Sequence, residues 1–172
     1  MILFSLAPRA ASAQVAQATP PWEVAAGYQS LDDPLDRVTL RGWMLDATLR
    51  LTPWLSAVGE TGAAARTILD VEIRQFAVLG GARATARIGP FAEFVQLTAG
   101  IARSGSTVFG ESSSDTAFAL QPGGGVDIPL GRGSRFAARL QIDRRAILGG
   151  PFNTDDRHDV RLGGALVYAS RR

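Results

Sequence analysis

Polar and apolar residues alternate most clearly in the stretch QPGGGVDIPLGRGSRFAARLQID, residues 121–143. Near its end, apolar residues share one parity: Phe136, Ala138, Leu140 and Ile142. The opposite parity is mainly polar: Arg135, Arg139, Gln141 and Asp143. Because successive side chains of a strand point to opposite faces, this pattern predicts a strand with one apolar and one charged face. A soluble sheet would bury the apolar face in a core, whereas a membrane barrel would turn it to lipid and enclose the charges.

Similar short alternating segments, separated by turn residues, recur along the chain and predict eight strands. We expect them at about 22–29, 39–51, 54–61, 71–86, 91–103, 116–128, 135–143 and 158–169. The long connections are predicted at 30–37, 62–70, 104–115 and 146–157, and they alternate with short turns. Outer-membrane barrels have long outer loops and short periplasmic turns, with both termini on the periplasmic side. The sequence therefore predicts an all-β fold, an eight-stranded antiparallel up-and-down transmembrane β-barrel that occupies residues 22–170.

Aromatic residues support the membrane interpretation, because such barrels carry aromatic girdles at both interfaces. Eight aromatic residues are candidates for these girdles: Trp22, Tyr28, Trp43, Trp54, Phe76, Phe118, Phe136 and Tyr168. Trp22, Trp54, Phe136 and Tyr168 are expected near the periplasmic side, and the other four near the opposite side. Phe91 does not fit the predicted outer face.

If the apolar faces meet lipid, the polar residues of the strands are enclosed. The predicted lumen set is Glu23, Asp46, Arg50, Glu60, Arg83, Glu93, Asp127, Arg139, Gln141 and Asp143. An eight-stranded barrel is only wide enough for its interior to be filled by side chains. Buried charges are costly unless they pair, so we expect a closed polar network. A narrow or gated pathway along the same charges is the alternative.

Composition narrows the functional classes. The chain has 172 residues, enough for one domain, and it contains no Cys, which excludes disulfides and thiolate metal sites. All 18 basic residues are Arg, against 16 acidic residues, and they are scattered, so no nucleic-acid footprint is present. Asp155, Asp156, His158 and Asp159 form the one cluster of metal-ligand types, which we interpret as a solvated rim. Gly123–Gly125 lack the Lys and Ser/Thr of a phosphate loop and predict a bend or a close approach. No cofactor is expected.

The first residues have a different character. Residues 1–13, MILFSLAPRAASA, combine a short apolar stretch with the small residues Ala11 and Ala13 around Ser12. This is typical of the back half of a secretory signal peptide, and a disordered alanine-rich leader is the alternative. Residues 14–21 end in Pro20-Pro21 and are expected to be an N-terminal tether.

Several stretches together resemble a known family: residues 42–62, 89–105, 123–143 and 160–168. The resemblance is to the bacterial OmpA-like eight-stranded outer-membrane β-barrels, and it covers the chain from about Trp22 to Tyr168. It is strongest in GGGVDIPLGRGSRFAARLQID. It implies a monomer in the outer membrane of a Gram-negative bacterium, with no single activity: members are structural proteins, adhesins or minor pores. Such barrels end in an aromatic residue, whereas this chain continues past Tyr168 to Arg172.

The leading hypothesis is a non-enzymatic outer-membrane protein that acts in envelope integrity or surface interaction through four extracellular loops. Its partners would be membrane lipid and an extracellular ligand whose nature the loops do not reveal. A soluble lipocalin-like barrel is an alternative, and it would leave Asp46, Arg139 and Asp143 exposed to solvent. A barrel enzyme would need a catalytic constellation, for which His158, the single histidine, is the best starting residue.

Overall fold

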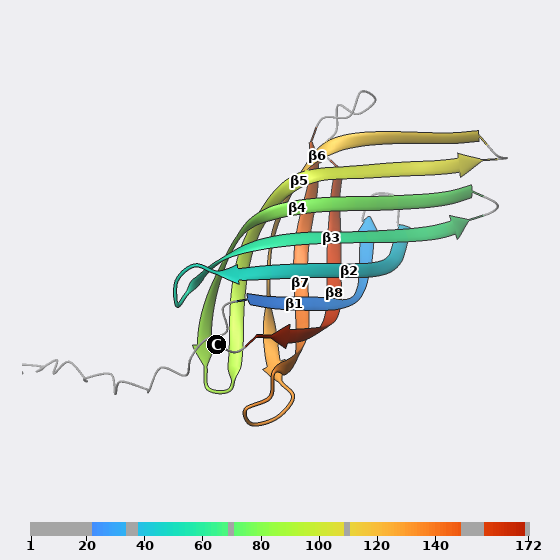
Figure 1. The fold of residues 1–172 in the computed structure, drawn as a ribbon. Helices are drawn as coiled ribbons and strands as arrows, with labels where there is room; N and C mark the ends of the chain where they lie inside the picture. Colours follow the sequence, from blue (N-terminus) through green and yellow to red (C-terminus); the bar gives the residue numbers. More distant parts are fainter. Residues whose placement is uncertain (1–21, 34–37, 69–70, 109–110, 149–156, 171–172) are drawn as a thin grey trace, which may run out of the picture.

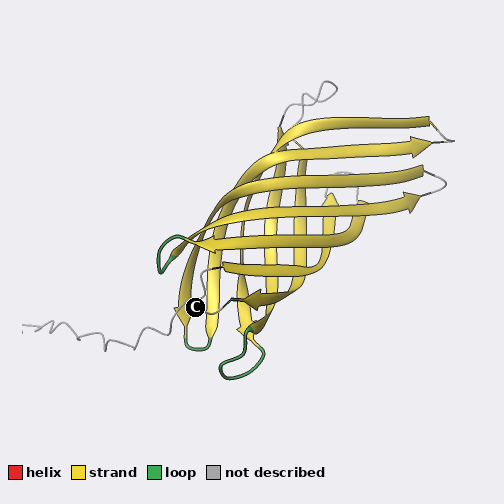
Figure 2. Ribbon diagram, viewed as in Figure 1, coloured by secondary structure: helices red, strands yellow, loops and turns green. Residues whose placement is uncertain are grey.

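In the computed structural model, residues 22–33, 38–68, 71–108, 111–148 and 157–170 are described. They form a closed antiparallel barrel in which each strand pairs with its neighbours in sequence and β1 pairs with β8 (Figure 1). The strands are β1 (Trp22–Asp33), β2 (Val38–Arg50), β3 (Leu55–Ile68), β4 (Val71–Ile88), β5 (Phe91–Val108), β6 (Glu111–Pro129), β7 (Phe136–Leu148) and β8 (Arg157–Ala169). Strands and their turns make up the whole described fold (Figure 2). Among the described residues, no helix is long and apolar enough to cross a membrane.

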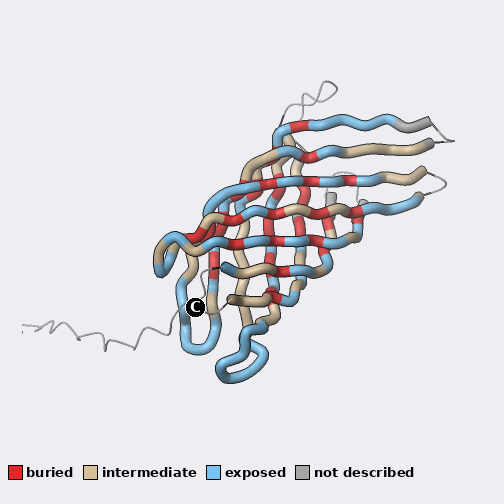
Figure 3. The backbone as a smooth tube through the Cα atoms, viewed as in Figure 1, coloured by how far each residue is buried: buried red, intermediate tan, exposed pale blue. Residues whose placement is uncertain are grey.

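The two-residue period of the sequence becomes the burial pattern of the strands. Along each strand, buried positions alternate with exposed ones, as the banding in Figure 3 shows. In β7, Arg139, Gln141 and Asp143 are buried while Leu140 and Ile142 are exposed. The predicted fold class and the direction of alternation in this strand are therefore confirmed.

Three short turns lie at one end of the barrel, at residues 51–54, 89–90 and 130–135. In the first, the backbone N–H groups of Leu51 and Thr52 both donate to the carbonyl oxygen of Leu55 at 2.9 Å. Gly89 adopts a φ of 60° and Gly133 a φ of 71°, values that glycine accommodates without a side-chain clash. Both ends of the described chain, Trp22 and Ser170, lie at this end, where the Ser170 amide donates to the Trp22 carbonyl oxygen at 3.0 Å.

The opposite end differs from the prediction. Most of the expected loops 62–70 and 104–115 are strand, because β3 continues to Ile68, β5 to Val108, and β6 begins at Glu111. The expected loops 30–37 and 146–157 are also shortened, since β1 reaches Asp33 and β7 reaches Leu148. Polar and glycine-rich sequence in these segments suggested loops. These residues continue the ladders that begin in the barrel, so they pair without an apolar alternation of their own, as Arg74 does with Gly105.

Strands β3 to β6 thus form two hairpins that extend beyond the rest of the barrel (Figure 1). The β2–β3 ladder ends at Arg41 and Ala65, and the β6–β7 ladder ends at Phe118 and Leu148. The β4–β5 and β5–β6 ladders, in contrast, continue to Val108. Among the described residues, the length asymmetry between the two ends of the barrel is therefore carried by paired strands.

Candidate functional site in the barrel interior

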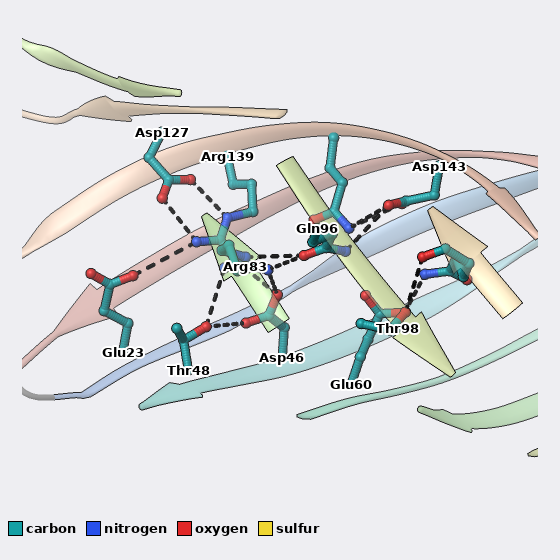
Figure 4. Close-up of polar contacts among 12 residues, drawn as sticks. Glu23, Asp46, Thr48, Glu60, Arg83, Gln96, Thr98, Asp127, Arg139 and Asp143 are labelled. Atoms are coloured by element: carbon teal, nitrogen blue, oxygen red, sulfur yellow. Dashed lines mark hydrogen bonds and ion pairs between the residues drawn. The ribbon is translucent and has the colours of Figure 1, made fainter. Parts of the chain in front are cut away.

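The interior of the barrel is a network of charged and amide side chains, drawn in part in Figure 4. It is assembled from inward-facing positions of every strand. Three of its largest fully buried side chains are Arg83 of β4, Arg139 of β7 and Arg161 of β8, with 2%, 1% and 0% of their surface exposed. Buried guanidinium groups are costly unless each is paired and hydrogen-bonded, so their partners determine what the interior can do.

Arg139 and Arg83 share one carboxylate. Arg139 donates through Nε and Nη2 to the two oxygens of Asp127, at 2.7 and 2.8 Å, and through Nη1 to Oδ2 of Asp46 at 2.8 Å. Arg83 donates to the same Oδ2 of Asp46 and to Thr48 Oγ1 at 3.1 Å. The geometry is that of a charge-assisted fork, which is stronger and more directional than a neutral hydrogen bond. This cluster spans the lumen from β2 to β7 (Figure 4).

One aromatic ring contacts both arginines. The guanidinium carbons of Arg83 and Arg139 lie 4.3 and 4.9 Å from the centroid of the Phe94 ring, which is itself buried. Both distances are suitable for cation–π attraction, which partly offsets the repulsion between two like charges. Space for the ring comes from Gly125, because a Cβ there would lie 2.8 Å from Phe94 Cζ.

A second cluster lies around Arg161. Its Nη1 and Nη2 donate to the two oxygens of Glu60, both at 2.7 Å, and its Nε and Nη2 donate to Asp143 Oδ2 at 2.9 and 2.6 Å. Asp143 is the register partner of Arg161 on the neighbouring strand, whereas Glu60 reaches it from β3. Gly123 leaves room for this arrangement, since a Cβ at Gly123 would overlap the Asp143 carboxylate.

Amide side chains join the two clusters and extend the second one. Gln96 accepts from Arg83 Nε at 3.0 Å and donates to Asp143 Oδ1 at 3.2 Å. Gln121 donates to Glu60 at 3.0 Å and accepts from Arg145 Nε at 2.8 Å. The interior is consequently one continuous network, in which removing a member leaves a buried group without its partner.

Between the Arg83–Asp46–Arg139 cluster and the end of the barrel that carries the short turns lies a cavity of about 840 Å³, which is open at that end. Glu23 and Asp127 line it, and both also contact Arg139, at 3.8 and 2.7 Å. Arg50 pairs with Glu23 at 3.3 Å near the same opening. The three carboxylates Glu23, Asp46 and Asp127 thus face three arginines here, and their formal charges cancel.

Nine of the ten residues predicted for the lumen lie on the inner face: Glu23, Asp46, Arg50, Glu60, Arg83, Asp127, Arg139, Gln141 and Asp143. The prediction for Glu93 is wrong. It is exposed and shares the outer face of β5 with Val95 and Leu97, whereas Phe94, Gln96 and Thr98 are buried. Phe91 also lies on this outer face, 42% exposed, contrary to expectation. The sequence FAEFVQ has an aromatic residue on each parity, so its periodicity could not select a face.

Several members of the network were missed by sequence reasoning: Gln29, Thr48, Gln75, Gln96, Thr98, Gln121, Arg145, Asp159 and Arg161. For Arg145 a signal existed, because it continues the odd-numbered series of Arg139, Gln141 and Asp143 beyond the predicted end of the strand. The buried glutamines carry no charge and gave no comparable signal.

The other candidate chemistry finds no support. Asp155 and Asp156 lie outside the described residues, and His158 and Asp159 occupy opposite faces of β8. Among the described residues, no group of acidic, His or Cys side chains could hold a metal ion. At the triple glycine, an added Cβ at Gly123 would meet the Asp143 side chain and one at Gly124 the backbone of β5, which confirms the close approach predicted as the alternative to a bend.

The outer face is the reverse of the interior. Large apolar side chains are exposed on every strand except β3, among them Leu49, Val95, Leu140 and Leu166. Of the predicted girdle residues, Tyr28, Trp43, Phe76 and Phe118 are exposed toward the end with the extended hairpins. Trp22, Trp54 and Phe136 are exposed toward the other end, where the Tyr168 ring lies 5.9 Å from that of Trp22 and 5.4 Å from that of Phe136. A soluble monomer rarely exposes so large an apolar surface.

Solved structures of several outer-membrane proteins have a similar architecture. Neisserial surface protein A is similar with a TM-score of 0.70 and 12% identity, over 86% of this chain and 95% of that one. Ail, the attachment invasion locus protein of Yersinia pestis, has a TM-score of 0.58 and 16% identity, over 87% and 99%. The N-terminal barrel domain of Pseudomonas aeruginosa OprF has a TM-score of 0.54 and 11% identity, over 87% and 99%. This chain has the fold of the OmpA-like eight-stranded outer-membrane barrels.

No family model and no curated protein sequence matches the chain. The resemblance predicted from sequence patterns is instead confirmed by the similarity of the folds. The soluble lipocalin-like alternative required an apolar interior with Asp46, Arg139 and Asp143 exposed. These three side chains are only 1–2% exposed, and the structure contradicts that alternative.

Proposed function

We propose that this chain is a non-enzymatic, monomeric outer-membrane barrel with a structural or surface-interaction role, and that its lumen is closed. The observation that carries the proposal is the inversion of polarity between the two faces, with arginines and carboxylates inside and a belt of large apolar side chains outside. Lipid is the solvent that suits an apolar outer face. A closed barrel can enter it because no backbone group of the barrel is left unpaired there.

The orientation follows from the two ends of the barrel. Short turns and both described chain ends mark the periplasmic end, and the extended β3–β6 hairpins mark the extracellular end. Export across the inner membrane would use the apolar N-terminal segment, and insertion would occur from the periplasm. The extracellular hairpins, rather than four long loops, would make contact with surface partners.

Membrane fractionation tests the location. The full chain, expressed with a functional export signal, should sediment with outer membranes and require detergent for extraction. On a gel, the unheated sample should migrate differently from the boiled one, because a closed barrel resists unfolding. A chain that stays soluble and monomeric without detergent would contradict the proposal.

Conductance measurements test the closed lumen against the narrow-pore alternative. Because the Arg83–Asp46–Arg139 cluster crosses the interior, wild-type barrels in planar bilayers should show no steady ion current. The double variant Arg83→Ala/Arg139→Ala removes both cations from the constriction and should admit current, while the exposed Arg144→Ala serves as control. A steady wild-type current would favour the pore.

A further inference from the structure

Small residues form the outer face of β3, in contrast to the strands on either side. Its outward positions are Ala57, Gly59, Thr61, Ala63 and Ala65. Strand registers give the flanking residues: Ala63 lies between Trp43 of β2 and Phe76 of β4, and Thr61 lies between Leu45 and Val78. The strands on either side of β3 are about 10 Å apart, so the larger side chains beside Thr61 and Ala63 create a furrow there. At Gly59 the furrow widens, because its register partners Ala47 and Gly80 are themselves small.

Arginines surround the extracellular end of this furrow. Arg41 and Arg74 flank Ala65 in the row directly beyond Trp43 and Phe76, and Arg103 is the register partner of Phe76. All three are exposed on the outer face. Together with Trp43, Phe76 and the alanines, they line a groove of about 530 Å³.

The charges at this end are only partly compensated. Arg74 forms a bidentate pair with Glu72, with both N–O distances at 2.6 Å. Arg103 donates to the hydroxyl of Ser114 at 2.9 Å, and no carboxylate in the described part of the chain pairs with Arg103 or with Arg41. The interior arginines, in contrast, are paired with acids. Within the described part of the chain, Arg41 and Arg103 are thus exposed beside Trp43 and Phe76 without a carboxylate partner, where an anionic group can reach them.

We propose that this groove binds a lipid whose head carries a phosphate monoester, with an acyl chain in the β3 furrow. The inference rests on the proposed membrane location. Arg41 and Arg103 would donate charge-assisted hydrogen bonds to the phosphate, a role for which guanidinium groups are well suited. Trp43 and Phe76 would lie where the lipid head group joins the acyl chain. The small side chains of Thr61 and Ala63 would let the acyl chain lie against the barrel.

Charge complementarity and the continuity of the groove with the apolar belt favour a lipid over a protein partner. A peptide or protein would dock farther along the extended hairpins, beyond the residues that line the groove. A free phosphate would use the arginines but would gain nothing from the furrow below them.

Quenching of Trp43 provides a direct test. The full chain carrying Trp22→Phe and Trp54→Phe retains Trp43 as its sole tryptophan, at the wall of the furrow. It would be inserted into phosphatidylcholine vesicles, and phosphatidic acid with brominated chains would be added at increasing mole fraction. We expect half-maximal quenching at a mole fraction about thirtyfold lower than with brominated phosphatidylcholine, because two arginines each attract the anionic head group.

Variants test separately how the lipid head group and its acyl chain contribute to binding. Arg41→Gln/Arg103→Gln should abolish the preference for phosphatidic acid, and the matched control Arg144→Gln, an exposed arginine on β7 outside the groove, should retain it. Ala63→Leu should weaken quenching with the arginines intact, whereas Ala26→Leu on the exposed face of β1 should not. Inorganic phosphate at millimolar concentration should not displace the lipid.

The outcomes distinguish the two proposals. If the chain inserts and shows heat-modifiable migration but quenching is equal for both lipids, the lipid site is wrong and the barrel proposal stands. Displacement by inorganic phosphate would also overturn the lipid site. A chain that does not insert at all contradicts the proposed function itself.

Discussion

The two faces of β7 show how this molecule inverts the usual order of a folded protein. Arg139 is 1% exposed and Leu140, the next residue, is 57% exposed. In a soluble barrel the leucine would be enclosed. Here the interior combines paired charges and amides with two small apolar clusters, around Leu79 and around Leu31, whereas many large apolar side chains face the surroundings of the barrel. The inner face therefore depends on exact partners, whereas the outer face depends only on being apolar.

The largest effect should come from breaking the inner face at Arg161. Arg161→Met leaves Glu60 and Asp143 facing each other in the interior without their shared cation. Removing one partner of a buried ion pair costs about 3–5 kcal/mol. Urea unfolding of the vesicle-inserted barrel measures this loss. Arg144→Met, on the exposed face of β7, should change the free energy of unfolding by less than about 0.5 kcal/mol.

A charge introduced on the outer face should lower the free energy of unfolding by nearly as much. Leu140→Arg exchanges an exposed leucine of the apolar belt for a cation, which costs about 2–4 kcal/mol near the middle of a bilayer. The same urea titration in vesicles gives the value, and Leu140→Ala is the control for the loss of the side chain alone. If the arginine variant were as stable as the alanine variant, Leu140 would not face lipid.

Glycine positions provide a smaller and matched test of the inner packing. In Gly125→Ala the new methyl group would meet Phe94 Cζ at 2.8 Å and, more closely, the Leu140 carbonyl oxygen. Overpacking of this kind costs about 1–3 kcal/mol. Gly164→Ala is the control, because nothing lies within 4 Å of its added Cβ. Equal unfolding free energies for the two variants would argue against the close approach at Gly125.

The smallest expected effect concerns the Phe94 ring that contacts both arginines. Phe94→Leu keeps an apolar side chain but removes the cation–π contacts with Arg83 and Arg139, so we expect a loss of about 1–2 kcal/mol. Phe91→Leu, on the outer face of the same strand, should have less effect on urea unfolding. A reversed order would mean that the ring acts only as a filler of volume.

Sequence reasoning succeeded where one parity was clearly polar and the other clearly apolar. In β7 the alternation alone assigned Arg139, Gln141 and Asp143 to one face, and the structure has them buried together. It failed at Glu93 because β5 carries apolar residues on both parities near its start. There the pairing with β4, which brings Gln96 beside Arg83, selects the inward face. The hairpin segments 62–68 and 104–108 were misassigned because polar strands in water lack the apolar alternation that identifies a strand.

By itself, the sequence determined the eight-stranded fold, the short turns at one end and the separation of apolar from charged faces, because these follow from local turn residues and a local two-residue period. Which charges meet was decided only by the tertiary structure. Arg161 pairs with Glu60, 101 residues away, and Arg139 with Asp46, 93 residues away. Such pairs form across the lumen, where barrel closure and strand register bring distant positions to one height. No local pattern encodes the position of a side chain along the barrel axis. Members of the network could therefore be predicted, but not which of them form ion pairs or hydrogen bonds with each other.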